Sequence, residues 1–262
     1  MNIVEFITNN LPTLLALVAT GVFAGILAGL LGVGGGIVIV PVLFFLFQSF
    51  GVSPESAMLV ATATSLATIV PTSISSISSH NKKGNVDFGL LKHWTVFILI
   101  GVLVGSWLVT RVEGTMLTIL FGVIATLSAL NMLFRTGKSA LYHKLPNTAG
   151  QTIMGTSIGF FSSMVGIGGG TISVPLLTLF NYPPHKAVGT AAAIGLIISL
   201  PGALTMLTLG NTPNDAPAGT FGLVNIFSFI CIVPLTVMFA PVGASLAAKL
   251  DAIKLKKIFA FV

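Results

Sequence analysis

The sequence contains very little charge. Of its 262 residues, 7% are Asp, Glu, Lys or Arg, whereas 54% are hydrophobic. Soluble domains carry roughly 25% charged residues, because a surface in contact with water has to be polar. A chain with so few charges is therefore predicted to place most of its surface in lipid. Its 29 glycines and 13 prolines agree with this prediction, since membrane helices tolerate both residues better than soluble helices do.

Cysteine occurs once, as Cys231, which excludes an intrachain disulfide and a metal site built from cysteines. The N-terminal segment MNIVEFITNN lacks the basic stretch of a cleaved signal peptide, so we expect the first apolar run to belong to the mature protein. The net charge of +6 does not indicate nucleic-acid binding. The basic residues form short clusters between apolar runs, without a basic groove or exposed aromatics.

Acidic side chains are missing from the middle of every apolar run. They lie in loops or at run ends: Glu5, Glu55, Asp87, Glu113, Asp215 and Asp251. Because cation and proton transporters usually carry a carboxylate within a span, this pattern disfavours a cation transporter. The histidines also lie at run ends and are expected at the membrane interface: His80, His93, His143 and His185. We predict no metal site and no cofactor, and the absence of hydrolase, metalloprotease and P-loop motifs predicts that the chain is not an enzyme.

Apolar runs predict an all-α, polytopic membrane protein. They cover about 11–31, 36–50, 57–79, 88–110 and 115–134, and, after a polar linker, about 151–167, 170–181, 187–209 and 220–248. A span needs about 20 residues, so the second run of each half is too short to cross comfortably. A broken or re-entrant helix is predicted there, provided that protein or water covers its irregular backbone. Each half is thus expected to hold about four spans, full or broken.

Lysine and arginine predict the orientation, because positive loops face the cytoplasm. They form three clusters: Lys82, Lys83 and Lys92; Arg135, Lys138 and Lys144; and Lys249, Lys254, Lys256 and Lys257. If all three clusters lie on the cytoplasmic side, the remaining loops alternate correctly between the two sides of the membrane. This holds only if each short second run crosses the membrane. This condition favours a broken helix over a re-entrant one.

A repeat relates the two halves. The segment GVFAGILAGLLGVGGGIVIVP at 21–41 aligns without gaps with GTSIGFFSSMVGIGGGTISVP at 155–175, and every glycine of the second meets a glycine of the first. We therefore predict two related units, a transmembrane repeat 1–134 and a transmembrane repeat 151–262, joined by a cytoplasmic linker 135–150. Loop 80–87 is basic, whereas its counterpart 210–219 is not. Equivalent loops on opposite sides predict inverted repeats, which are typical of secondary transporters with a central site.

The repeated segment carries G-x-G-G-G followed by proline. Each glycine costs roughly 1 kcal/mol relative to alanine within a helix, so the helix is expected to break there. The helix that restarts would turn its N–H groups and its positive end toward the gap, and two such breaks would bind an anion. Predicted substrate-binding positions are Gly34, Gly35, Gly36, Gly168, Gly169 and Gly170, and predicted break or gating positions are Gly32, Pro41, Gly166 and Pro175. The alternative role of these glycines is close helix packing.

Hydroxyl side chains are concentrated in the third run, 57–79. Most are expected to bond to neighbouring helices or backbone carbonyls. Thr64 and Ser65 of this run, and Thr190 of its counterpart in the second half, are the predicted substrate contacts, because the repeat alignment brings them into correspondence.

The paired G-x-G-G-G-(x)4-P segments resemble those of the sulfite exporter TauE/SafE family, also called the 4-toluene sulfonate uptake permeases. So do SPESAMLVATATSL at 53–66, HNKKGNVDF at 80–88 and HKAVGT at 185–190. The resemblance covers nearly the whole chain. It implies a transporter of the cytoplasmic membrane that handles sulfite, thiosulfate, sulfoacetate or another organosulfonate, with a site between the halves.

The leading hypothesis is therefore a secondary transporter of a small sulfur-containing anion that works by alternating access. An anion channel on the same scaffold, and a membrane sensor or enzyme without transport, are the alternatives. The expected partners are the small anionic substrate and membrane lipid, with no nucleic acid; a homodimer is left open.

Overall fold

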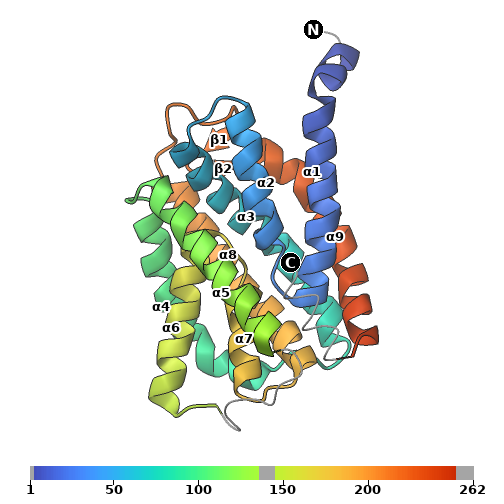
Figure 1. The fold of residues 1–262 in the computed structure, drawn as a ribbon, viewed down its shortest axis with the longest axis vertical. Helices are drawn as coiled ribbons and strands as arrows, with labels where there is room; N and C mark the ends of the chain where they lie inside the picture. The colour runs from blue at the N-terminus through green and yellow to red at the C-terminus, as the bar shows by residue number, and fades with distance from the viewer. Residues whose placement is uncertain (1–2, 136–144, 252–262) are drawn as a thin grey trace.

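The computed structural model describes residues 3–135 and 145–251, whose regular secondary structure is helical apart from one short hairpin (Figure 1). The helices are α1 (Ile3–Leu31), α2 (Gly36–Ser49), α3 (Pro54–Asn81), α4 (Phe88–Val109), α5 (Gly114–Arg135), α6 (Thr148–Val165), α7 (Gly170–Leu179), α8 (Pro184–Leu209) and α9 (Ile226–Lys249). The hairpin pairs β1 (Thr220–Phe221) with β2 (Val224–Asn225) in antiparallel register. The predicted basic positions Lys138, Lys144, Lys254, Lys256 and Lys257 lie outside the described residues.

Six of the described helices are long and apolar enough to cross a membrane: α1, α3, α4, α5, α8 and α9. This confirms a polytopic, all-helical membrane protein. The helices α2 and α7 have 14 and 10 residues. At 1.5 Å per residue they extend about 21 Å and 15 Å, less than the roughly 30 Å of a hydrocarbon core. They do not span it by themselves.

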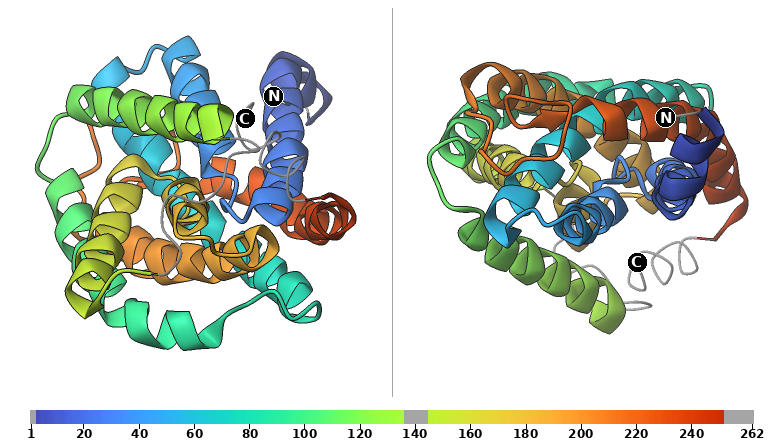
Figure 2. Two further views of the ribbon diagram at one scale, coloured as in Figure 1. Left: turned by 60° about the horizontal axis from the view of Figure 1, so that its bottom comes forward. Right: turned by 90° about the horizontal axis from the view of Figure 1, so that it is seen from above.

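The core is built around α3, the candidate span with the largest buried share, which packs against α8. On one side of this centre α1 lies along α9, and on the other α4 lies along α6 (Figure 2). The helix α9 also packs against α3, and α4 against α8. Glycine makes the outer pairs close, since a methyl group added to Gly25 would lie 2.8 Å from Cα of Thr236. At Gly105 the same group would lie 2.6 Å from the carbonyl oxygen of Phe160, as small-residue packing in membranes requires.

The bundle has two chemically different ends. At the first, which we call the acidic end, loop 50–53 meets loop 210–219, where the backbone N–H of Ser53 donates to Asp215. At the second, the basic end, loop 82–87 meets loop 180–183 and the end of α9, so that Lys83 lies near Lys249 and Asp87 near Lys186.

Each short helix runs back toward the end from which the chain entered. The helix α2 begins in the interior and ends at loop 50–53, at the acidic end, while α7 begins in the interior and ends at loop 180–183, at the basic end. In Figure 1 they occupy the upper and lower parts of the bundle. The preference for a broken helix that crosses the membrane stays a prediction: α1–α2 and α6–α7 form helical hairpins whose turns lie in the interior, and α1 is itself long enough to cross. The loops keep their expected sides, because a hairpin returns the chain to the side that a pair of crossings would reach.

Candidate anion site at the two glycine turns

The turns 32–35 and 166–169 interrupt the helices where the glycine motif predicts a break. Gly32, Gly34 and Gly35 have φ of 69°, 71° and 86°, and Gly166 has φ of 70°. These are left-handed conformations, which glycine adopts without the steric cost that a Cβ atom brings. The first predicted function of the motif, breaking the helix, therefore agrees with the backbone.

The two turns lie against each other in the interior. A methyl group added to Gly36 would lie 2.5 Å from the carbonyl oxygen of Gly166 and 3.0 Å from Cα of Ile167. Added to Gly168 or Gly170, it would collide with the backbone carbonyls of the first turn. The structure thus brings both predicted glycine triads together, and close packing is one of their roles.

The helices that restart after the turns have no side-chain cap. Their N-cap residues are Gly35 and Gly169, neither of which offers a side chain to the first-turn N–H groups. By contrast, Ser53, Asp87 and Asn225 cap α3, α4 and α9. An uncapped first turn leaves N–H donors and the positive end of the helix dipole directed at its surroundings. Because the turns are buried, two such ends face the interior of the protein.

The predicted hydroxyl contacts divide into two groups. Ser65 Oγ donates to the carbonyl oxygen of Gly166 at 2.7 Å and so belongs to the glycine turns. Thr64 Oγ1 accepts from the backbone N–H of Asn225 at 2.8 Å, and Thr190 Oγ1 accepts from that of Asp87 at 3.0 Å. These two threonines hold the starts of α9 and α4. The predicted proline positions lie within the short helices, Pro41 in α2 and Pro175 in α7.

Five buried hydroxyl groups that are not among the predicted substrate contacts have no hydrogen-bond partner among the described residues. They are those of Thr62, Ser73, Ser162, Thr171 and Ser199. An unpaired buried hydroxyl is unusual, and it marks a position that a polar ligand can satisfy. No spacing rule separates them from the many partnered hydroxyls of the same helices.

His80 is a second departure from expectation. Predicted at the membrane interface, it is 1% exposed, and its Nε2 lies 2.7 Å from the carbonyl oxygen of Gly29. That carbonyl belongs to the last turn of α1, where a helix leaves acceptors without intrahelical donors. The imidazole therefore serves as a cap for α1. Among the described residues, no three His, Cys, Asp or Glu side chains gather as a metal site would need.

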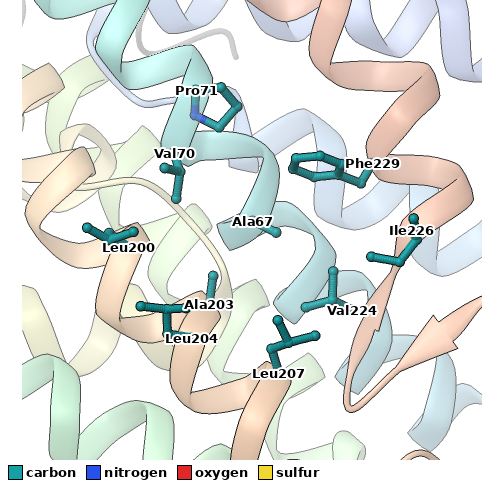
Figure 3. A pocket seen from close by; sticks show the side chains of 10 residues that line it. All are labelled: Ala67, Val70, Pro71, Leu200, Ala203, Leu204, Leu207, Val224, Ile226 and Phe229. Atoms are coloured by element: carbon teal, nitrogen blue, oxygen red, sulfur yellow. The ribbon is translucent and has the colours of Figure 1, made fainter.

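One cavity lies between α3, α8 and α9 and has a volume of about 240 Å³ (Figure 3). Its lining is entirely apolar: Ala67, Val70, Pro71, Leu200, Ala203, Leu204, Leu207, Val224, Ile226 and Phe229. An anion placed there would lose its hydration without gaining a donor. The cavity is therefore not the anion site.

A hydrogen-bonded carboxylate, which we call a clasp, links two loops at the basic end. The hydroxyl of Tyr182, in the loop after α7, donates to Asp87, in the loop after α3. This bond, with a second from the N–H of Leu90, holds the pKa of the Asp87 carboxyl below its usual range. Burial, and then the neighbouring carboxylate, raise the pKa of Tyr182. At physiological pH Asp87 therefore stays ionised and Tyr182 stays neutral.

A second carboxylate clasp links two segments at the acidic end. Asp215, in the loop after α8, accepts from the backbone N–H of Ser53 at 2.8 Å and from the hydroxyl of Ser56 at 2.5 Å. It sits at the start of α3, where the helix dipole favours an anion. These hydrogen bonds, that from Ser56 foremost, lower the pKa of Asp215 to about 2.

Fold and site together define a polytopic α-helical membrane protein with two helical hairpins whose glycine turns meet in its interior. The family described as sulfite exporter TauE/SafE matches residues 17–262, and the chain belongs to this family. A probable membrane transporter protein of Haemophilus influenzae is 32% identical over 240 residues, which cover 92% of this chain and 91% of the relative. A probable membrane transporter protein of Methanocaldococcus jannaschii is 29% identical over 237 residues, 86% and 81% of the two chains. No solved structure matches. The chain is therefore a membrane transporter and not an enzyme.

Proposed function

We propose that the protein is a secondary transporter that moves a small sulfur-containing anion across the cytoplasmic membrane by alternating access. Sulfite, thiosulfate, sulfoacetate and other organosulfonates are the candidate substrates, in keeping with the family's description as sulfite exporters. The observation that carries the proposal is the meeting of two uncapped helix starts in a buried interior. Helix starts attract anions, and sulfur oxyanions are well suited to backbone N–H donors.

Inverted repeats are part of the proposal and agree with the packing of the helices. If the repeat 1–134 is superposed on the repeat 151–262, α1 corresponds to α6, α3 to α8 and α4 to α9. The pair α1–α9 then corresponds to α6–α4, and the pair α3–α9 to α8–α4, and all four pairs pack together. The linker predicted at 135–150 would connect the repeats at the cytoplasmic side; its residues 136–144 lie outside the described part of the chain.

The two clasps support alternating access. At the basic end a carboxylate after α3 binds the loop after α7, and at the acidic end a carboxylate after α8 binds the loop after α2. Each clasp therefore joins one half to the short helix of the other half. Both clasps are formed in this conformation. Opening one end requires the release of one clasp and the movement of the short helix attached to it. Following the positive-inside rule, the basic end faces the cytoplasm.

Counterflow in proteoliposomes tests the proposal. Vesicles loaded with unlabelled sulfite, thiosulfate or sulfoacetate should accumulate the same labelled anion from outside, with saturation and with competition among good substrates. Gly36→Ala should abolish this exchange, because the added methyl group would collide with Gly166. Gly122→Ala is the matched control, since nothing lies within 4 Å of its methyl group. Anion conductance without counterflow would instead establish a channel on the same scaffold, and no movement of any anion would refute the proposal.

A further inference from the structure

We propose that the anion binds at the start of α7, in the space between Ser73 of α3 and Gly195 of α8, and that the start of α2 does not form an equivalent subsite. The inference deepens the proposed transport function and rests on it. It assigns a binding role to two residues outside the glycine motif.

The start of α7 supplies the positive pole. Its N-cap residue Gly169 has no side chain to satisfy the first-turn N–H groups of this 10-residue helix. The hydroxyl of Thr171, in the same first turn, is fully buried and has no partner. A bound oxyanion would accept from these donors, as anions do at other helix starts.

Ser73 provides the independent observation. It is 1% exposed, and its hydroxyl has no hydrogen-bond partner. The oxygen lies 3.0 Å from the position that a methyl group on Gly195 would take, and the backbone nitrogen of Gly169 lies 3.7 Å from the same position. The hydroxyl and the helix start thus face one small volume. The distance between the Ser73 oxygen and the Gly169 nitrogen is therefore at most the sum of these two distances. One oxyanion can span it by accepting a hydrogen bond of about 2.9 Å from each group on a different oxygen.

Gly195 contributes no side chain to that volume. Apart from the Ser73 oxygen and the Gly169 nitrogen, the nearest atom to the added methyl group is Cγ2 of Ile69, at 3.9 Å. Both helix starts contact an isoleucine: a methyl group on Gly34 would lie 2.7 Å from Ile69, and one on Gly169 would lie 2.4 Å from Ile194. The starts differ in their polar neighbours. The Ser73 hydroxyl lies beside the start of α7, whereas the atoms nearest to methyl groups on Gly34, Gly35 and Gly36 are side-chain carbons and backbone atoms.

The donors define the chemical class of the ligand. They are neutral N–H and O–H groups, which suit an anion with several exposed oxygens, such as sulfite, thiosulfate or the sulfonate head of an organosulfonate.

Binding of sodium sulfite and sodium sulfoacetate to the purified full-length protein, measured by calorimetry, tests the subsite. Ser73→Ala should weaken binding roughly tenfold to hundredfold, the effect of one hydrogen bond to a charged ligand. Gly195→Ala should abolish binding while leaving the thermal unfolding temperature unchanged or raised, because alanine favours the helix and meets a hydroxyl that can rotate. Gly202→Ala, on the same helix and beside the flexible end of Leu66 at 3.1 Å, is the matched control and should bind as the wild type does.

The outcomes separate the two proposals. If the wild-type protein neither binds nor exchanges any of the probe anions, the transport function is refuted. If the wild type binds and transports, but Ser73→Ala and Gly195→Ala match it, the subsite is wrong and the function stands. Equal loss of binding in Gly195→Ala and Gly202→Ala would assign the effect to helix packing and overturn the subsite.

Discussion

Gly166 and Gly84 have nearly the same backbone conformation, yet replacing each by alanine should have very different effects on stability. Their φ angles are 70° and 66°, and a left-handed conformation costs an L-residue roughly 1–2 kcal/mol. At Gly84 nothing lies within 4 Å of the added methyl group, whereas at Gly166 Cα and the carbonyl oxygen of Thr62 both lie at 2.8 Å. Those atoms are backbone of α3 and cannot rotate away.

Overpacking of this kind in a packed core lowers the free energy of unfolding by roughly a further 1–3 kcal/mol. Gly84→Ala should therefore lose about 1–2 kcal/mol, and Gly166→Ala about 2–5 kcal/mol. For a protein of this size, 1 kcal/mol corresponds to roughly 2–4 °C in the midpoint of thermal unfolding. The two variants are thus expected to unfold about 2–8 °C and 4–20 °C below the wild type.

Thermal unfolding of the three proteins in one detergent measures the difference. Gly122→Ala, an exposed helical position with open surroundings, provides a control in which a small gain from helix propensity is expected. Equal losses in Gly84→Ala and Gly166→Ala would mean that the glycine turn does not approach α3 as closely as described, and the argument for a compact pair of turns would fail.

Three further predictions concern the contacts around the site. Tyr182→Phe should remove the clasp on Asp87 and increase labelling of cysteines introduced at the basic end by a membrane-impermeant reagent, without a comparable change at the acidic end. Thr64→Val should leave the N–H of Asn225 without its acceptor and lower stability by about 1–3 kcal/mol; unchanged unfolding would contradict the hydrogen bond. Asp215→Ala should destabilise the protein at neutral pH. Because the pKa of Asp215 is lowered to about 2 in the fold, the difference from wild type should persist above about pH 4 and shrink as the pH falls toward 2.

The sequence predicted the helices well because their signal is local. Apolar runs such as 88–110 and 115–134 reappear as α4 and α5 with shifts of a residue, since hydrophobic length alone decides where a span lies. The glycine breaks were equally predictable, because a left-handed turn requires the residue type that the motif repeats.

Depth in the membrane could not be predicted in the same way. Crossing helices and re-entrant hairpins return the chain to the same side, so the charges of the loops fit both. Partners of hydroxyl groups were also hidden. Thr64 and Ser73 lie on one helix with similar burial. Thr64 has a partner in Asn225 of β2, 161 residues away, while Ser73 has none among the described residues. That difference depends on packing between distant segments and has no local signal.

The pairing of α1 with α9 has a consequence for the biogenesis of the protein. The groove of Gly21, Gly25 and Gly29 is filled by α9, which follows α1 by about 200 residues. At roughly 5–20 residues per second, α1 waits on the order of 10–40 s at the translocon before its partner is synthesised. During that time lipid or an insertion chaperone has to occupy the groove. A ribosome that stalls before α9 would release a chain in which the glycine face of α1 has no partner helix.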